Sequence, residues 1–321
     1  MARYFGHYNE SMVPRAHLES LGYHPYAYGY PWETVVKSDF TEKTTKLYVH
    51  GRQSYEMSYV MPDQKTVYST DDGTNCVFTM FKATTEKDIK EGTNWCMKMT
   101  QTCADGADAI DFTANVTWIE MPTPKHSEVA AAIKTTTFSD LFDYEACTGS
   151  DFAETCATAG FKTVNIGEGC ECLKAKAGKE KLAAVFEKRR YAAYLGCTAE
   201  FRKWEGFTYD SATKKAYTAI SSVEYGMEDN KDKRDYGSPN HIRIAKEKCG
   251  CVMEFDIDDN MKATQARMLT CGKASSDANP ATAGNFKDSC DTGAIANPDN
   301  VATIPGARQV LLDSPRAATS S

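Results

Sequence analysis

The chain has 321 residues, of which 41% are hydrophobic, and its formal net charge is −7 at pH 7. This length can bury a sizeable core, as one large domain or two ordinary ones. The negative charge argues against a nucleic-acid partner, because a phosphate backbone would be repelled. No uninterrupted apolar stretch reaches the about 20 residues that a transmembrane helix needs.

The N-terminal residues 1–47 are rich in Tyr, His and Pro and contain the run Tyr23-His24-Pro25-Tyr26-Ala27-Tyr28-Gly29-Tyr30-Pro31-Trp32. Aromatic side chains in such a run can stack on a base or a sugar. They more often contribute to a core, so we expect this run to pack against an edge of the fold.

The next segment predicts a β-hairpin that opens with an acidic residue. Glu56-Met57-Ser58-Tyr59-Val60 and Thr66-Val67-Tyr68-Ser69-Thr70 flank a polar turn over residues 61–65. Short runs rich in β-branched and aromatic residues, separated by turn residues, are typical of paired strands. Another strand, Cys76-Val77-Phe78-Thr79-Met80-Phe81, follows, and a second cysteine stands at position 96.

The strand pattern fades between residues 101 and 162, which we interpret as an insertion or a degenerate repeat. One helix is then predicted over Ala175–Leu195, since apolar residues recur on one face and Gly196 is placed to end it. Its pair Arg189-Arg190 is expected on a solvated face, with a phosphate or an acidic neighbour as the alternative partner.

The clearest hairpin lies over Glu205–Ile220. A charged loop over residues 221–248 follows, and it is expected to be a solvated excursion or a gate at the mouth of a site. The strand Cys251-Val252-Met253-Glu254-Phe255-Asp256 comes next, with a further cysteine at position 271. A third hairpin pairs Asp299-Asn300-Val301-Ala302 with Gln309-Val310-Leu311-Leu312, and residues 314–321 are expected to be a disordered tail.

The three hairpins share one register. The spacing from the opening acid to the large residue of the returning strand is twelve residues in Glu56–Tyr68, Glu205–Tyr217 and Asp299–Leu311. Two of the hairpins are each followed by a strand that begins with a cysteine, Cys76 or Cys251. A second cysteine stands twenty residues after each of these. Four-stranded modules that recur in this way predict an all-β protein, a β-propeller built of four-stranded blades with one inserted helix and long loops.

In a propeller the first strands of the blades line a central channel, so the three opening acids are expected to converge. Two like charges about 4 Å apart repel by roughly 4 kcal/mol at an effective dielectric constant of 20. Converging carboxylates therefore take up protons or bind cations, and oxygen ligands suit hard cations such as calcium. The alternative is that each acid pairs with a backbone amide at the entrance of its strand.

Twelve cysteines favour an oxidising, extracellular compartment. Cys170-Glu171-Cys172 and Cys249-Gly250-Cys251 lack the two-residue gap of a zinc site, and disulfides are the better interpretation. The acceptor sequences Asn9-Glu10-Ser11 and Asn115-Val116-Thr117 agree with secretion.

Six motifs, in order, resemble the PhoX-type alkaline phosphatases: Gly51-Arg52-Gln53-Ser54-Tyr55-Glu56, Tyr68-Ser69-Thr70-Asp71-Asp72, Arg189-Arg190-Tyr191-Ala192, Phe201-Arg202-Lys203-Trp204-Glu205-Gly206, Cys249-Gly250-Cys251-Val252 and Pro298-Asp299-Asn300-Val301-Ala302. The similarity runs from about Tyr48 to Leu312, apart from residues 101–162. That family consists of secreted phosphomonoesterases that depend on calcium and iron and are built on a β-propeller, so the resemblance implies a small-molecule phosphomonoester as substrate.

The resemblance also implies site residues. Glu56, Glu205 and Asp299 match metal-binding acids of the family, and Asp71 and Asp72 match an acidic pair of which at least one should face the metals. Lys203, with Arg202 beside it, stands where the family has a basic residue near the phosphate. These two residues are the predicted catalytic residues.

Two departures from the family pattern stand out. Tyr55 occupies a position that is usually His before the first Glu. The family's thiolate ligand for Fe³⁺ lies in an upstream Cys-Ala-Gly-Gly stretch, and this chain has no Cys before Cys76. We therefore expect a partial propeller over residues 1–321, incomplete at both ends. A non-catalytic calcium-binding propeller of the same family is the alternative function, and a disulfide-rich binding scaffold without metal is a weaker one.

Overall fold

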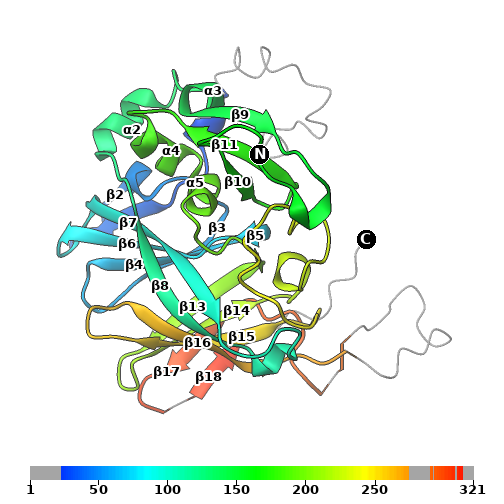
Figure 1. Cartoon of the computed structure of the whole chain (residues 1–321). Helices are drawn as coiled ribbons and strands as arrows, with labels where there is room; N and C mark the ends of the chain where they lie inside the picture. The colour runs from blue at the N-terminus through cyan, green and yellow to red at the C-terminus, as the bar shows by residue number, and fades with distance from the viewer. Residues whose placement is uncertain (1–22, 275–289, 292, 308, 314–321) are drawn as a thin grey trace, which may run out of the picture.

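The computed structural model describes residues 23–274, 290–291, 293–307 and 309–313. The expected tail at 314–321 and the acceptor sequence at Asn9 lie outside the described residues. Strands dominate the rest, which confirms the predicted all-β class (Figure 1). The strands of the largest sheet are β3 (Tyr55–Val60), β4 (Thr66–Asp71), β6 (Thr79–Thr85), β7 (Asp88–Gln101), β8 (Thr113–Met121), β13 (Trp204–Asp210), β14 (Lys215–Ile220), β15 (Cys251–Ile257) and β16 (Ala263–Cys271).

This sheet contains the two predicted four-stranded modules as antiparallel units. Its order is β13-β14-β15-β16-β8-β7-β6-β4-β3, so β8 joins the unit β3-β4-β6-β7 to the unit β13-β14-β15-β16. The two outermost strands meet: the backbone N–H of Phe207 on β13 lies 3.1 Å from the sulfur of Met57 on β3, and the ring of Phe207 lies 5.4 Å from that of Tyr59. The sheet is therefore nearly closed on itself.

The predicted third hairpin is present and packs on β13. It consists of β17 (Val301–Ile304) and β18 (Gln309–Leu312) and lies at the bottom of Figure 1, below β13 and β14. Smaller sheets complete the fold. They are β1 (Trp32–Val36) with β2 (Glu42–Lys46), β5 (Thr74–Cys76) with β12 (Phe201–Arg202), and β11 (Cys170–Ala175) between β9 (Phe142–Ala146) and β10 (Lys162–Asn165).

The prediction of one inserted helix over Ala175–Leu195 is wrong. Ala175 ends β11, and two helices follow, α4 (Glu180–Phe186) and α5 (Lys188–Tyr194). They are separated at Glu187, whose φ of −121° and ψ of 48° are not helical. The apolar face of α4 is buried, but the backbone turns at Glu187 so that α5 packs against β10 instead of continuing the same axis.

Two further helices occur where the strand pattern fades, α2 (His126–Ala132) and α3 (Phe138–Leu141). Single-turn 3₁₀ segments cover Pro25–Ala27, Tyr48–His50, Ala109–Asp111, Asp151–Ala153 and Tyr225–Met227. The helices and the sheet β9-β10-β11 form the upper part of the molecule in Figure 1. None of the helices in the described ranges is long and apolar enough to cross a membrane.

The two largest of four hydrophobic clusters among the described residues hold these layers. Aromatic rings fill the curve of the main sheet: Trp204 stacks on Phe78 at 4.5 Å, and Phe78 stacks on Phe255 at 5.5 Å between ring centres. The second core lies beneath the helices, where Tyr26 stacks on Phe186 at 4.7 Å. The expectation that the N-terminal aromatic run packs as core is thus confirmed for Tyr26 and Tyr30, which are both buried.

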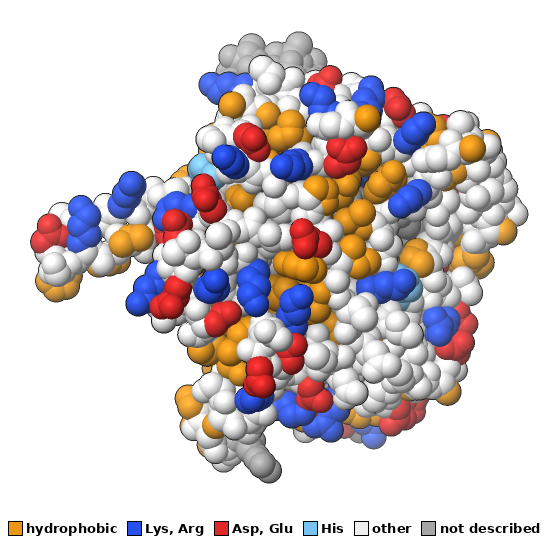
Figure 2. All heavy atoms as spheres, turned by 60° about the vertical axis from the view of Figure 1, so that its left-hand side comes forward, with side chains coloured by type: hydrophobic (Ala, Val, Ile, Leu, Met, Phe, Trp, Pro, Cys, Tyr) orange, Lys and Arg blue, Asp and Glu red, His pale blue; other side chains and the backbone are white. Residues whose placement is uncertain are grey.

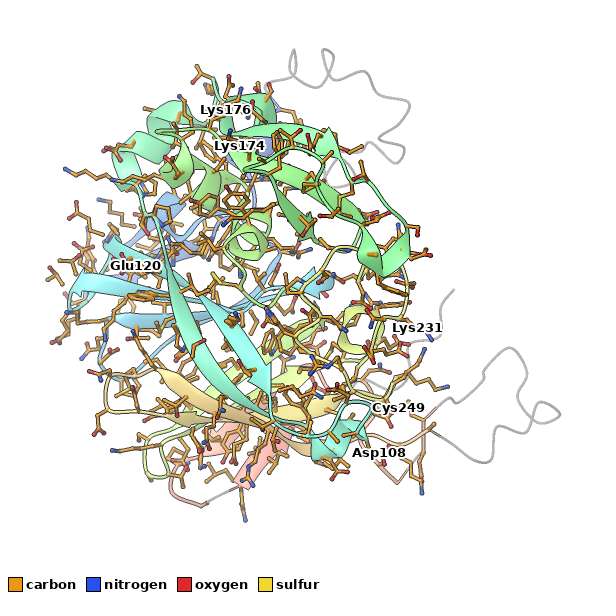
Figure 3. The ribbon with its side chains drawn as sticks, viewed as in Figure 1. Asp108, Glu120, Lys174, Lys176, Lys231 and Cys249 are labelled. Atoms are coloured by element: carbon orange, nitrogen blue, oxygen red, sulfur yellow. A yellow bond between two sulfur atoms is a disulfide. The ribbon has the colours of Figure 1, made fainter. Side chains whose placement is uncertain are left out.

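Five disulfides confirm the interpretation of the cysteine pairs: Cys96–Cys197, Cys147–Cys170, Cys156–Cys172, Cys249–Cys290 and Cys251–Cys271. Each Cys-X-Cys sequence thus bonds to two different cysteines. In Figure 3, Lys174 on β11 lies near the top of the molecule and Cys249 lies in its lower part. Cys76 and Cys103 carry free thiols.

Candidate metal and phosphate site

Three acidic side chains come together at the seam between β3 and β13. Oxygens of Glu56, Glu205 and Asp299 all lie within 4.8 Å of one another. These are the acids that open the three repeated hairpins. Glu205 is buried, Asp299 is half-buried and Glu56 is exposed, so the group opens to solvent on one side.

Glu56 and Glu205 each lie at a shift in the pairing register of their strand. The register of β3 against β4 shifts between Tyr55 and Ser58, and the register of β13 against β14 shifts between Trp204 and Phe207. Each acid thus lies at a β-bulge, a feature that bends a strand and re-aims a side chain. Because the bulge recurs in both modules, the two carboxylates approach each other from the two strands that meet.

Gly206 brings the third acid to this seam. Its N–H donates to the carbonyl oxygen of Asp299 at 2.8 Å. A Cβ at position 206 would lie 2.9 Å from that oxygen and 3.0 Å from the Cα of Asn300. Only glycine therefore allows the backbone before β17 to approach β13 so closely.

Asp72 is a fourth carboxylate beside this group. Its charge raises the pKa of both Glu56 and Glu205, and its Oδ1 is buried without a hydrogen-bond partner. Asp72 stands sixteen residues after Glu56, as Ser221 stands after Glu205. The hydroxyl of Ser221 donates to Oε1 of Glu205, so equivalent positions of the two modules both serve this site. Ser221 was not among the predicted site residues, although the sixteen-residue spacing of the repeat is a sequence signal for it.

Lys203 brings a positive charge to the group. Its Nζ lies 3.4 Å from Oδ1 of Asp72 and 3.9 Å from Oε1 of Glu205. The residue joins β12 to β13 in the left-handed region, with a φ of 48°. Its N–H donates to the carbonyl oxygen of Gly73 at 2.8 Å. The chain thus turns sharply to direct the ammonium group to the carboxylates.

Arg202 points to a different neighbourhood. Its guanidinium donates to Oγ1 of Thr74 at 2.8 Å and lies 5.0 Å from the centre of the Tyr225 ring. Its Nε is buried and has no hydrogen-bond partner. The structure therefore brings Lys203, but not Arg202, into contact with the acids.

Asp71 lies apart from the group. It is fully buried, and its two oxygens accept from the guanidinium of Arg189 at 2.7 and 2.8 Å. Oδ1 also accepts from the N–H of Ser54 at 3.0 Å. Of the predicted acidic pair, only Asp72 faces the other carboxylates. Arg189 is thus bound to an acid rather than solvated.

The carboxylates perturb one another. Desolvation raises the pKa of Glu205, the Ser221 hydroxyl and Lys203 oppose that rise, and Asp72 and Glu56 add to it. Desolvation also raises the pKa of Glu56, and the charges of Asp72 and Asp299 raise it further. When all are ionised, four carboxylates face one ammonium group, which leaves three uncompensated negative charges.

The donor set fits a hard cation. Oxygens of three acids lie within the span of one ion's ligands, and Oδ1 of Asp72, which faces Lys203 but accepts no hydrogen bond, lies beside them. Calcium takes several carboxylate oxygens in flexible geometry. A thiolate for iron is not among these residues: the nearby free thiol of Cys76 is fully buried, and burial raises its pKa. Within the described chain the site thus offers oxygen ligands alone.

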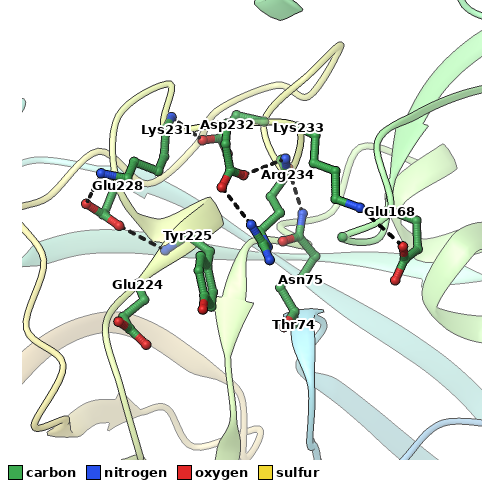
Figure 4. A network of polar contacts seen from close by, with 12 residues as sticks. Thr74, Asn75, Glu168, Glu224, Tyr225, Glu228, Lys231, Asp232, Lys233 and Arg234 are labelled. Carbon is green, nitrogen blue, oxygen red and sulfur yellow. Dashed lines mark hydrogen bonds and ion pairs between the residues drawn. The ribbon is translucent and has the colours of Figure 1, made fainter.

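The charged loop over residues 221–248 packs beside Arg202, and most of its residues are buried or half-buried. Asn75 donates to the carbonyl oxygen of Arg234 at 2.8 Å, and the guanidinium of Arg234 stacks on Tyr225 at 3.8 Å (Figure 4). Asp235 is buried and accepts from the N–H of Lys231. These contacts anchor the loop to β5. Tyr225 could not be predicted from the sequence, because a lone tyrosine in a charged run carries no signal.

Basic and acidic side chains are interspersed over the face shown in Figure 2, with hydrophobic side chains along a hollow in its middle. This face therefore has no large area of a single charge.

The chain was compared with family models, curated proteins and solved structures, and a match was found among the solved structures. No family model matches the chain, and no curated protein matches its sequence. Among solved structures, Pseudomonas fluorescens PhoX in complex with vanadate, a transition-state analogue, matches with a TM-score of 0.53 and 14% sequence identity. The match covers 92% of this chain and 45% of PhoX, so this chain spans less than half the length of that protein. The chain has a PhoX-like fold.

Proposed function

We propose that this protein is an extracellular, metal-dependent phosphomonoesterase of the PhoX type. The convergence of Glu56, Glu205 and Asp299 beside Lys203 is the observation that carries the proposal. The fold shared with PhoX, a protein solved with vanadate as a transition-state analogue, supports phosphoryl chemistry. The disulfides support an oxidising, extracellular compartment.

Charge explains why this site requires cations. A phosphomonoester is an anion, and a group of carboxylates with an excess of negative charge repels it. Glu56, Glu205, Asp299 and Asp72 would hold calcium ions, whose positive charge, once bound, attracts and polarises the phosphoryl oxygens. Ionisation of Glu56 and Glu205 prepares the site for this, and Ser221 favours the ionised form of Glu205 by donating a hydrogen bond.

In this proposal Lys203 is the residue that binds the phosphate. Its ammonium group is held between Asp72 and Glu205, so it is oriented before substrate arrives. A fixed positive charge stabilises the negative charge that develops on the phosphoryl oxygens in the transition state. Arg202, the other predicted catalytic residue, contacts Thr74 and Tyr225 instead of the acids, so in this proposal it supports the neighbouring Lys203 through the backbone.

The test uses the purified protein with calcium and an aryl phosphate. Glu205→Gln keeps the side-chain size but removes the charge that a cation needs, so we expect hydrolysis to fall at least 100-fold while the circular dichroism spectrum persists. Glu120→Gln is the matched control, because Glu120 is exposed on β8 (Figure 3).

Full activity of the Glu205 variant would contradict the proposed site. Calcium binding without hydrolysis in the parent protein would favour a non-catalytic calcium-binding propeller instead. If the parent protein neither binds calcium nor hydrolyses the ester, a disulfide-rich binding scaffold without metal would be favoured.

A further inference from the structure

A second pocket, of about 270 Å³, lies at the start of α5. Its wall is formed by one segment before β3 and by the residues where α4 gives way to α5. The charged and polar lining residues are Arg52, Gln53, Ser54, Lys188, Arg189 and Arg190, and Glu187 is the acid among the lining residues. Four of the residues that line this small cavity are thus cationic.

Two of these cations are already neutralised. Arg189 pairs with Asp71 at 2.7 Å. Arg190 donates to Glu171 and to Glu187, each at 2.6 Å. Glu187 also accepts from the hydroxyl of Tyr26. The acidic side chains of Asp71, Glu171 and Glu187 therefore already have partners.

The other two cations have no acidic partner in the described part of the chain. Arg52 donates only to the carbonyl oxygens of Tyr28 and Phe186, at 2.8 and 2.7 Å, and lies over the ring of Tyr26. Lys188 is 2% exposed, and its Nζ donates to the hydroxyl of Thr79 at 2.9 Å. A buried cation is stable only when it is paired. The pocket thus has positive charge in excess.

The pocket adjoins the acid cluster. Ser54 lies two residues before Glu56, a separation of about 7 Å along an extended chain. The N–H of Asp72 donates to the carbonyl oxygen of Ser54 at 2.9 Å, and Arg189 donates to the carbonyl oxygen of Asp72 at 3.0 Å. A small molecule that occupied both places would have two ends. One anionic end would lie at the cations held by the acid cluster, and the other end would lie in this pocket.

We propose that this pocket binds an oxyanion, and that the oxyanion is a carboxylate or second phosphate on the leaving group of the substrate. The substrate class would then be phosphomonoesters whose alcohol carries a second acidic group. The assignment to the leaving group rests on the proposed phosphomonoesterase function. The oxyanion site itself rests only on Arg52, Lys188 and their neighbours.

The first experiment tests the oxyanion site without catalysis. Calorimetry measures binding of inorganic sulfate in EDTA, where carboxylates without cations repel anions. Burial lowers the pKa of Lys188 to about 7, against the opposing charge of Asp71, so the titration is done at pH 6. We expect Arg52→Gln and Lys188→Met each to weaken sulfate binding at least tenfold. Lys174→Met, which removes an exposed lysine of β11, is the matched control and should bind sulfate as the parent does.

The second experiment identifies the source of the oxyanion. We expect kcat/KM for 4-carboxyphenyl phosphate to exceed that for phenyl phosphate at least tenfold in the parent, and this ratio to approach one in Lys188→Met and Arg52→Lys. Sulfate binding that is unchanged in both charge-removing variants overturns the site. A ratio near one in the parent, or no hydrolysis of either ester, overturns the leaving-group assignment. Sulfate binding that depends on Arg52 and Lys188 then shows that the pocket is a site for free oxyanions.

Discussion

At the scale of single residues, burial decides which ionisable groups influence stability. His50 is 1% exposed, its ring stacks on Phe81 at 4.1 Å, and Nε2 donates to the carbonyl oxygen of Ile89 at 2.9 Å. Burial lowers the pKa of His50 to about 3, although the hydrogen bond to Ile89 opposes the change. The imidazole therefore stays neutral in the folded protein at pH values where an unfolded chain protonates it.

This histidine predicts a loss of stability in acid. Its folded-state pKa is depressed, so its contribution is complete above the unfolded pKa of about 6.5 and is lost as pH falls toward 3. Between pH 7 and pH 5 we expect the free energy of unfolding to drop by about 2 kcal/mol. Urea denaturation at both pH values measures it. His50→Gln should be less stable at pH 7 but should lose less on acidification; an equal loss in both proteins would contradict the assignment.

At the scale of elements, one ion pair ties a helix to the main sheet. Arg189 near the start of α5 donates two hydrogen bonds to Asp71 at the end of β4, and a third to the carbonyl oxygen of Asp72. Asp71 has no exposed surface. Removing one partner of such a pair leaves a buried charge without compensation.

We expect Arg189→Met to reduce the free energy of unfolding by about 3–5 kcal/mol, since Asp71 would remain buried without its partner. Asp71→Asn combined with Arg189→Met should restore part of that stability, because no charge is then left unpaired. Chemical denaturation of the three proteins measures the difference. Lys233→Met, which removes an exposed ion pair with Glu168, is the control and should change stability by less than about 1 kcal/mol. A double variant less stable than Arg189→Met would rule out this account.

At the scale of the whole molecule, the acid cluster lies at the seam where the nine-stranded sheet nearly closes. Glu56 is on β3, Glu205 is on β13, and Asp299 precedes β17. Repulsion among these carboxylates pushes the two edges of the sheet apart. A cation bound there would join the edges and stabilise the fold.

Calcium is therefore expected to raise the melting temperature and EDTA to lower it, because a ligand that binds only the folded state stabilises it by mass action. A calcium concentration 100 times the dissociation constant should add about 2.7 kcal/mol. Differential scanning calorimetry with calcium, with EDTA and with magnesium measures the effect. A melting temperature that does not respond to calcium or to chelation would argue against a metal at the seam.

The sequence alone determined the hairpins and the three opening acids. Alternation, turn residues and the twelve-residue spacing are local signals, and the strands β3, β4, β13, β14, β17 and β18 form where those signals lie. The pairing of cysteines into disulfides instead of zinc ligands followed from their spacing. The carboxylates of Glu56, Glu205 and Asp299 meet because the hairpins share a register; their roles as ligands stay predictions.

Tertiary structure alone decided which partner each charged side chain finds. Neighbouring residues at the end of a strand point to opposite faces, so Asp71 turns inward to Arg189 while Asp72 faces Lys203. The break between α4 and α5, and the excess charge of Arg52 and Lys188, depend on contacts between segments more than 100 residues apart in sequence. Periodicity reports the burial of a side chain, but not which distant group it meets, because that choice is made only when the elements pack.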